Sequence, residues 1–267
     1  MTEGVTVYSQ VGVNCLSGPE TSVPPGEAAE SLAAVHAIVS DHLPPGEVAI
    51  YEAGGGAASY LPRALLRRAH VTVVDLDPTQ IANNAYAATL IRGDVQTHRF
   101  PPGRFDLVTC YNVIEHLPDV EAALVRFCEA LKPGGLLLIA APHPRSLSGL
   151  VTRYSPHGFH VWFYRHIRGH ARAGEPGEPP FPVHYHPLVL PRRLVAFAEA
   201  RGFEVVYRQA YESPRYPEMR ARRPWLAALL DRATDGMNWA FAHRINVRHG
   251  DYHLVLRKRA ASGRAGT

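Results

Sequence analysis

Hydrophobic positions along the chain alternate between helical and strand-like spacing, a pattern typical of an α/β protein. Leu32, Val35 and Val39 recur at three- and four-residue steps, which predicts a helix from about Gly26 that ends before the prolines at 44 and 45. Helical spacing returns at 58–69, at 120–131 and around 194–198. Compact apolar or β-branched runs predict strands at 48–51, 70–74, 105–110, 136–141, 203–207 and 252–256, with one more ending near residues 93 and 94.

The order of these elements predicts a parallel sheet. The strand at 48–51 runs directly into a glycine turn at Gly54, Gly55 and Gly56, and a helix and a strand ending at Asp75 follow. Strand, turn, helix and strand in this order form a βαβ unit, whose two strands are parallel. Because the alternation continues, the sequence predicts a doubly wound α/β core.

Two stretches interrupt the alternation. Residues 142–187 are rich in proline, histidine, arginine and aromatic residues, and residues 211–249 form a second, partly helical insert. We therefore expect a cap segment and helix at 1–45, a core at 46–141, an insertion at 142–200, C-terminal strands at 201–260 that enclose the insert, and a flexible tail at 261–267.

Composition narrows the class of protein. Lysine and arginine number 28 against 24 acidic residues, and this mild excess is spread along the chain, unlike the basic stripe of a nucleic-acid binder. The three cysteines lack metal spacing, and their odd number argues against a disulfide framework. The longest apolar run, 136–141, is far below the ~18 residues of a membrane helix. We expect a cytoplasmic protein with neither nucleic-acid nor membrane partners.

The glycine turn is the first candidate for a binding site. A turn without side chains lets a ligand approach the backbone, and Asp75, nineteen residues past Gly56, could accept hydrogen bonds from both hydroxyls of a ribose. The same geometry and nearly the same spacing occur in nicotinamide dinucleotide sites. A tight turn beside a solvated acid is the simpler alternative.

The motifs around and after the glycine turn distinguish between these kinds of site. EAGGGAAS at 52–59, VVDLDP at 73–78, GDV at 93–95, FDLV and NVIEHL at 105–117, and LKPGGLLLI at 131–139 follow one another in order. With these motifs the chain resembles the class I S-adenosylmethionine-dependent methyltransferases. The resemblance implies a Rossmann-like, seven-stranded, mostly parallel sheet with an antiparallel last strand, S-adenosylmethionine as the cofactor and S-adenosylhomocysteine as its product. Ala58 departs from the family, which often has a third glycine there.

The resemblance also implies which residues bind the cofactor. Glu52 and the glycine turn, with Gly54, Gly55 and Gly56, are assigned to the methionine end of the cofactor. Asp75 and Leu76, at the end of the second strand, are assigned to the ribose. Asp94 and Val95, after the third strand, are assigned to the adenine, and Asn112, at the end of the fourth, to the sulfonium. Asp77, followed by a proline, is expected to cap the next helix instead.

Methyl transfer to an oxygen or nitrogen of a small molecule is the expected activity, and a specialised metabolite is one such acceptor. A hydroxyl or protonated amine must lose a proton near neutral pH, for which histidine is best matched. His116, just beyond Asn112, is the first candidate base, and His143 is the second. A structural role for His116 in the turn that contains it stays open. Cyclisation, decarboxylation or aminocarboxypropyl transfer with the same cofactor is the alternative reaction class, and a non-catalytic binding module is a third.

The insert after the fifth strand is expected to form an acceptor-binding lid, with its aromatics as an apolar wall and its arginines as ligands for a carboxylate or phosphate. Packing of these aromatics onto the sheet is the alternative. Histidines at 157, 160, 184 and 186 lack the usual spacing of metal ligands, so no metal is expected. The oligomeric state is expected to be a monomer or homodimer. The predicted substrate-binding residues are Tyr8, which is expected to close over the cofactor, and Arg153, His157, His160, Trp162 and Arg165.

Overall fold

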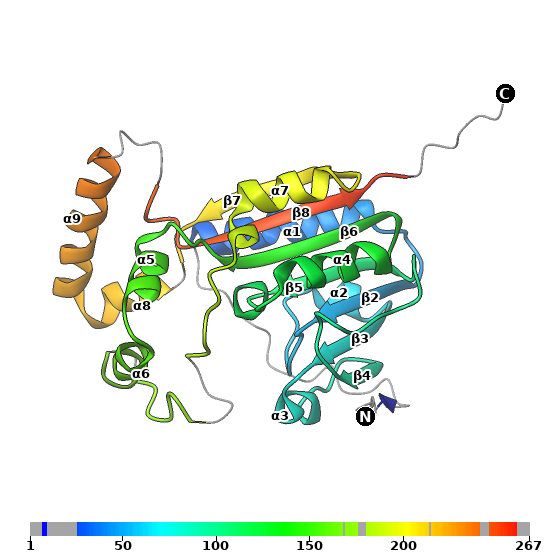
Figure 1. Cartoon of the computed structure of the whole chain (residues 1–267), viewed down its shortest axis with the longest axis horizontal. Helices are drawn as coiled ribbons and strands as arrows, with labels where there is room; N and C mark the ends of the chain where they lie inside the picture. Colours follow the sequence, from blue (N-terminus) through cyan, green and yellow to red (C-terminus); the bar gives the residue numbers. More distant parts are fainter. Residues whose placement is uncertain are drawn as a thin grey trace.

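The computed structural model describes residues 26–167, 169–175, 180–213, 215–240 and 246–260, together with the backbone of 7–9. Its centre is one mixed sheet in the order β1-β4-β3-β2-β5-β6-β8-β7 (Figure 1). The strands are β1 (Val7–Ser9), β2 (Val48–Ala53), β3 (Ala69–Asp75), β4 (Thr89–Arg92), β5 (Phe105–Tyr111), β6 (Leu131–Pro142), β7 (Phe203–Tyr211) and β8 (Asp251–Lys258).

Strand directions confirm the predicted sheet. Neighbouring strands from β4 through β3, β2 and β5 to β6 are parallel. The last strand, β8, is antiparallel to both β6 and β7, so β7 runs in the same direction as β6. These seven strands are therefore six parallel ones and an antiparallel last one, as the motifs imply. The short β1 pairs antiparallel with the outer edge of β4 and was not predicted.

Helices cover both faces of the sheet, which makes the fold doubly wound. One core joins the sheet to α4 (Val120–Ala130) and α7 (Pro191–Glu199). The other core joins the opposite face to α1 (Glu27–His42), α2 (Arg63–Leu66) and α3 (Pro78–Ala82). Since side chains of successive strand residues point to opposite faces, each central strand contributes to both cores. None of the described helices combines the length and apolar character needed to cross a membrane.

The predicted helix at 58–69 is wrong in extent, because only Arg63–Leu66 is helical. Pro62 is the N-cap residue of this short helix, and its ring disfavours helical backbone at the residue before it. The Ser59 hydroxyl accepts a hydrogen bond from the Leu61 backbone N–H at 3.1 Å, which holds the preceding segment in a turn. β6 is longer than predicted, since it begins at Leu131 directly after α4.

Both inserts are helical in part and gather at one end of the sheet (Figure 1). They contain α5 (Leu147–Tyr154), α6 (His157–His166), α8 (Arg215–Arg222) and α9 (Pro224–Ala240), with the 3-10 turns η1 (Ile114–His116) and η2 (Pro187–Val189) nearby in the chain. The domain boundaries inferred from sequence stay a proposal.

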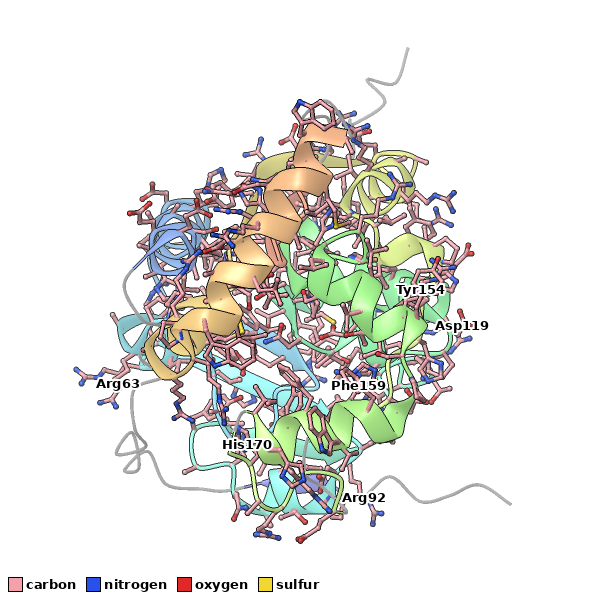
Figure 2. All side chains as sticks on the ribbon, turned by 90° about the vertical axis from the view of Figure 1, so that its left-hand side faces the viewer. Arg63, Arg92, Asp119, Tyr154, Phe159 and His170 are labelled. Atoms are coloured by element: carbon pink, nitrogen blue, oxygen red, sulfur yellow. The ribbon has the colours of Figure 1, made fainter. Side chains whose placement is uncertain are left out.

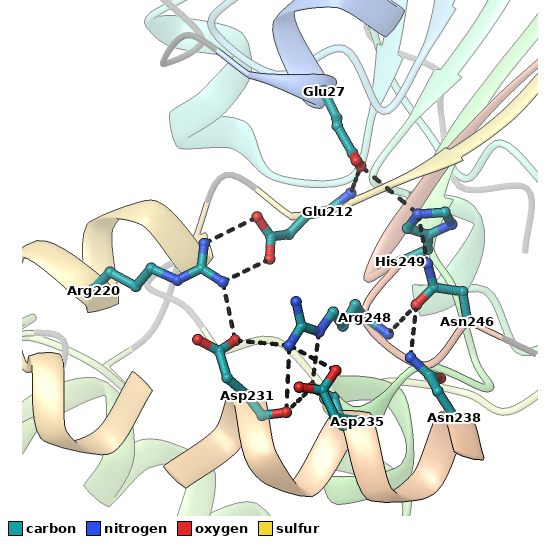
Figure 3. A network of polar contacts seen from close by, with 10 residues as sticks. Glu27, Glu212, Arg220, Asp231, Asp235, Asn238, Asn246, Arg248 and His249 are labelled. Carbon is teal, nitrogen blue, oxygen red and sulfur yellow. Dashed lines mark hydrogen bonds and ion pairs between the residues drawn. The ribbon is translucent and has the colours of Figure 1, made fainter. Parts of the chain in front are cut away.

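A polar network fastens α8 and α9 to the core (Figure 3). Arg220 on α8 contacts Glu212 at 3.3 Å and Asp231 of α9 at 3.0 Å. Glu212 in turn donates its backbone N–H to the Glu27 carboxylate at the start of α1, over 2.8 Å. The network thus links the second insert to the first helix of the chain.

Candidate active site at the carboxyl ends of the strands

The glycine turn after β2 has no room for side chains. A Cβ atom on Gly54 would lie 2.5 Å from a methyl carbon of Val113, and Gly54 has a φ of +67°. A Cβ on Gly55 would lie 2.9 Å from the Cβ of Glu52. Both distances are shorter than carbon atoms tolerate, so the turn requires glycine at these two positions.

Side chains from the end of β3, from α3 and from the loop after it hold this turn in place. Asp75 Oδ2 accepts the Gly56 backbone N–H at 3.0 Å, and Gln80 Oε1 accepts that of the next residue at 3.2 Å. The Asn84 amide donates to the Gly56 carbonyl at 2.6 Å, and the Tyr86 hydroxyl oxygen lies 3.2 Å from the Gly55 carbonyl oxygen. Sequence analysis singled out Asp75 as a ribose ligand but missed Gln80, Asn84 and Tyr86. Their position after the second parallel strand, at the edge where such sheets bind ligands, was the available signal.

Glu52 is a buried carboxyl group, only 3% exposed. The Ser59 hydroxyl donates to its Oε1 at 2.5 Å, and the Tyr86 hydroxyl donates to its Oε2. Burial raises the pKa of Glu52 to about 7, against the opposing effect of these two hydrogen bonds. An ammonium group placed beside Glu52 would favour its ionised form. The turn therefore offers a site suited to the amino group of an amino acid.

Two further acids follow the neighbouring strands. Asp75 Oδ1 also accepts the Asp77 backbone N–H at 2.9 Å, and burial raises the Asp75 pKa above its usual value. Asp94 accepts both the backbone N–H, at 2.9 Å, and the side-chain amide of Gln96. Beside Asp75, the Leu76 side chain is 61% exposed.

Asp77 caps α3, as predicted, because its Oδ1 accepts the Thr79 backbone N–H at 2.8 Å. The Asp77 carboxylate is therefore engaged in a hydrogen bond at the N-terminus of α3. Val95, predicted beside Asp94, is buried in the core.

A small cavity of about 60 Å³ lies against the turn, bounded by Glu52, Gly54, Tyr60 and Tyr111 among others. The rings of Tyr60 and Tyr111 stack with centroids 3.8 Å apart. The Tyr111 hydroxyl lies 2.9 Å from Nε2 of the buried His253 on β8. Through this hydrogen bond, Tyr111 connects the wall of the small cavity to β8.

A much larger cavity of about 620 Å³ lies beyond the carboxyl ends of β5 and β6. Asn112 contributes to its lining and has a φ of +54°, in the left-handed region that asparagine tolerates better than most residues. The next residue, Val113, contacts the glycine turn, so one short segment borders both the turn and the cavity. Figure 2 views the molecule from this end.

His116 lines the large cavity and is fixed by a hydrogen bond to the loop opposite. Its Nδ1 lies 2.7 Å from the carbonyl oxygen of Pro182. Because a carbonyl only accepts, Nδ1 carries the proton and the neutral ring keeps its lone pair on Nε2. Glu115 Oε1 is 3.7 Å from that Nε2, so a proton taken up there would be stabilised by a carboxylate. This arrangement suits a general base.

His143 lines the same cavity with the opposite tautomer. Its Nδ1 accepts the Arg145 backbone N–H at 3.2 Å, which leaves the proton of the neutral ring on Nε2. Burial, together with the nearby charges of Arg145 and His249, lowers the pKa of His143 to about 4. His143 is therefore a neutral hydrogen-bond donor near pH 7 and a weak base.

The other predicted substrate residues divide into two groups. Arg153, His157 and His160 line the cavity. Trp162 and Arg165 are not among the described residues that line it, since Trp162 stacks on Phe159 and the Arg165 Nε donates to the Ala173 carbonyl at 2.9 Å. Both side chains make their contacts within the insert, and the predicted role of these two residues in substrate binding stays a prediction.

Tyr8 lies in β1, where its backbone pairs with Leu90. Its side chain lies outside the described residues, so its predicted contact with the cofactor stays a prediction. Within the described ranges, no group of three histidine, cysteine or acidic side chains is placed to hold a metal ion.

Known proteins share this domain. A methyltransferase domain model matches residues 51–139. A ubiquinone biosynthesis O-methyltransferase of Marinobacter nauticus is 31% identical over 128 residues, which cover 41% of this chain and 52% of that protein. The chain spans about half or less of the length of the curated relatives it matches.

Two solved structures share the fold at low identity. A sarcosine dimethylglycine methyltransferase, so described provisionally, from Galdieria sulphuraria is 15% identical with a TM-score of 0.54, over 87% of this chain and 85% of that one. The cyclase SpnF is 17% identical with a TM-score of 0.50, over 85% and 81%. The domain match and the sheet order agree: residues 51–139 are a methyltransferase domain, and the chain has the class I, Rossmann-like fold of the methyltransferases whose cofactor is S-adenosylmethionine.

Proposed function

We propose that the chain transfers a methyl group from S-adenosylmethionine to an oxygen or nitrogen of a small molecule held in the 620 Å³ cavity. The observation that carries this proposal is the segment from Asn112 to His116. It borders the glycine turn through Val113 and lines the large cavity through Asn112 and His116. A cofactor and an acceptor would therefore meet at this segment.

The cradle residues fit the cofactor. Glu52 and the open backbone of the glycine turn would hold its amino-acid end, for which the small cavity beside them offers space. Asp75 would accept hydrogen bonds from the ribose hydroxyls, while Asp94 and the Val95 backbone would read the adenine edge. The exposed Leu76 would cover the ring. When bound, the cofactor supplies a sulfonium-activated methyl group.

The protein's own task is alignment and proton removal. The cavity wall holds the acceptor and limits access of water, which contributes through proximity and orientation. His116 would take the acceptor proton at Nε2 while Nδ1 keeps its bond to the Pro182 carbonyl. His143, with its proton on Nε2, would donate a hydrogen bond to the acceptor or remain part of the wall.

Binding calorimetry with S-adenosylhomocysteine, with NAD as the control, tests the cofactor site. We expect micromolar binding of the first and none of the second. Turnover with S-adenosylmethionine then distinguishes the reaction classes by product. S-adenosylhomocysteine as product supports methyl transfer, whereas methylthioadenosine would assign the chain to aminocarboxypropyl chemistry. Conversion of an acceptor with the cofactor recovered intact would favour cyclisation, and binding without turnover would favour a regulatory module.

A small-molecule acceptor is part of the same proposal, and a cytoplasmic location and a monomeric or homodimeric state stay predictions beside it. None of them affects the assignment of the site.

A further inference from the structure

The wall of the large cavity has an uneven charge. Among the described residues that line it, Arg153 is the permanent cation and Glu115 is the acid, and five histidines accompany them. Glu115 is buried, and the acid lies beside His116. The part of the wall away from Glu115 therefore carries positive charge and hydrogen-bond donors.

Arg153 is held between two aromatic rings. Its guanidinium carbon lies 5.7 Å from the ring centroid of Tyr154 and 5.6 Å from that of Tyr185. Contacts of this kind restrict the planar guanidinium. They leave its N–H groups, which lie in the plane of the guanidinium, available to other partners. Among the described residues, no carboxylate forms an ion pair with Arg153, although most other arginines of the insert regions have such a partner or a carbonyl.

The hydroxyl group of Tyr185 is a second hydrogen-bond donor, and it has no partner among the described residues. It is inaccessible to water. A buried hydroxyl without a partner costs about 1–3 kcal/mol, so a ligand that displaces the side chains covering this hydroxyl and supplies an acceptor atom would be favoured here. Tyr185 lines the same cavity as Arg153, and its ring contacts the guanidinium.

We propose that the acceptor is a small molecule with an anionic group on an aromatic body, and that Arg153 and Tyr185 bind the anion. This inference rests on the proposed function, because it concerns the acceptor of that reaction. Carboxylate and phosphate both match the planar donors of arginine, and Phe181 and Tyr164 supply aromatic surface for the body of the molecule. Arg153 and Tyr185 would then set the acceptor's orientation relative to His116.

The test is calorimetry of three probes with the protein saturated with S-adenosylhomocysteine. Benzoate and phenyl phosphate carry the anion, and benzamide is the neutral match for benzoate. We expect at least one anion to bind about tenfold or more tightly than benzamide, since charge-assisted hydrogen bonds exceed neutral ones. The tighter of the two anions identifies the group. Equal affinity of all three probes, or no binding of either anion at millimolar concentration, overturns the proposal.

Variants locate the anion site. Arg153→Gln should weaken binding of the preferred anion about 10- to 100-fold and leave benzamide unaffected, Arg153→Lys should restore part of the loss, and Tyr185→Phe should lower the same preference. Arg67→Gln, at the exposed end of α2 by the amino end of β3, removes the same charge elsewhere and should change nothing. An unchanged preference in Arg153→Gln contradicts the assignment.

Failure of the proposed function has a different signature. If S-adenosylhomocysteine does not bind, the cofactor site is wrong, and the same three probes are then measured on the protein alone. A preference for the anions that depends on Arg153 would still support an anion site there. Melting temperatures of the variants, expected within a few degrees of the parent, ensure that a lost affinity is not a lost fold.

Discussion

The Nδ1 atom of His116 lies 2.7 Å from the carbonyl oxygen of Pro182, a residue 66 positions further along the chain. This bond decides which ring nitrogen has the lone pair. It also joins the turn after β5 to the loop that closes the other side of the cavity, so the orientation of the ring depends on both segments.

Replacement of His116 by asparagine tests the proposed base. The asparagine amide can still donate toward Pro182, because it occupies the place of Nδ1, but it cannot take up a proton. We expect turnover to fall about 10²- to 10⁴-fold, the usual contribution of a general base, with S-adenosylhomocysteine affinity unchanged. Steady-state kinetics and calorimetry measure the two quantities. A loss smaller than about tenfold would mean that alignment alone carries the reaction.

His143→Gln is the matched comparison within the same cavity. Since the pKa of His143 is lowered to about 4, its neutral ring has little affinity for a proton near pH 7. Glutamine keeps a donor close to the place of Nε2, so we expect a loss of turnover well below that of His116→Asn. If the two variants lost equal activity, or if the order were reversed, the assignment of the base to His116 would be wrong.

Asp75→Ala should weaken cofactor binding by about 1–3 kcal/mol, the cost of leaving polar partners unpaired. Asp75 also holds the Gly56 backbone N–H, so the variant loosens the glycine turn in addition to losing the ribose contact. Calorimetry with S-adenosylhomocysteine provides the measurement. Asp77→Ala is the control, because it removes the neighbouring carboxylate and the helix cap, which costs about 1 kcal/mol of stability, without removing the proposed ribose ligand. Unchanged affinity in Asp75→Ala would exclude Asp75 from the site.

Local signals explain why the sheet and the cradle could be predicted from the sequence. Buried parallel strands are short apolar runs. The glycine turn follows one directly, Asp75 ends the next, and Asp94 lies two residues past the end of a third. The capping role of Asp77 was likewise evident because a proline follows it. The motifs then limited the ligand classes.

Long-range contacts explain what could not be predicted. The first part of the helix expected at 58–69 does not form, because Ser59 and Tyr60 make other contacts. The Ser59 hydroxyl bonds to Glu52, and the Tyr60 ring stacks on Tyr111 of β5. The aromatic insert allowed two roles for every residue, and only three-dimensional packing placed Arg153 in the cavity and Arg165 outside it. Spacing along the chain contains no information about such partners.

The buried His253 should make stability depend on pH. Its Nδ1 lies 2.8 Å from the Ser31 hydroxyl, and its Nε2 lies 2.9 Å from the Tyr111 hydroxyl and 3.0 Å from that of Tyr211. Burial, together with the nearby His36, lowers the pKa of His253 to about 4. The unfolded chain, with a histidine pKa near 6.5, therefore binds more protons than the folded one between pH 6.5 and 4.

Stability from His253 is thus present above pH 6.5 and is lost as the pH falls toward 4. Glu52 acts in the opposite direction, since its raised pKa of about 7 stabilises the folded state on acidification between pH 7 and 4.5. A variant isolates the histidine. The stability difference between the parent and His253→Gln should shrink by about 2 kcal/mol from pH 7 to pH 5, as measured by denaturant unfolding. His42→Gln, an exposed histidine on α1, controls for the loss of an imidazole. A difference that stays constant with pH would mean that His253 is not the group that titrates.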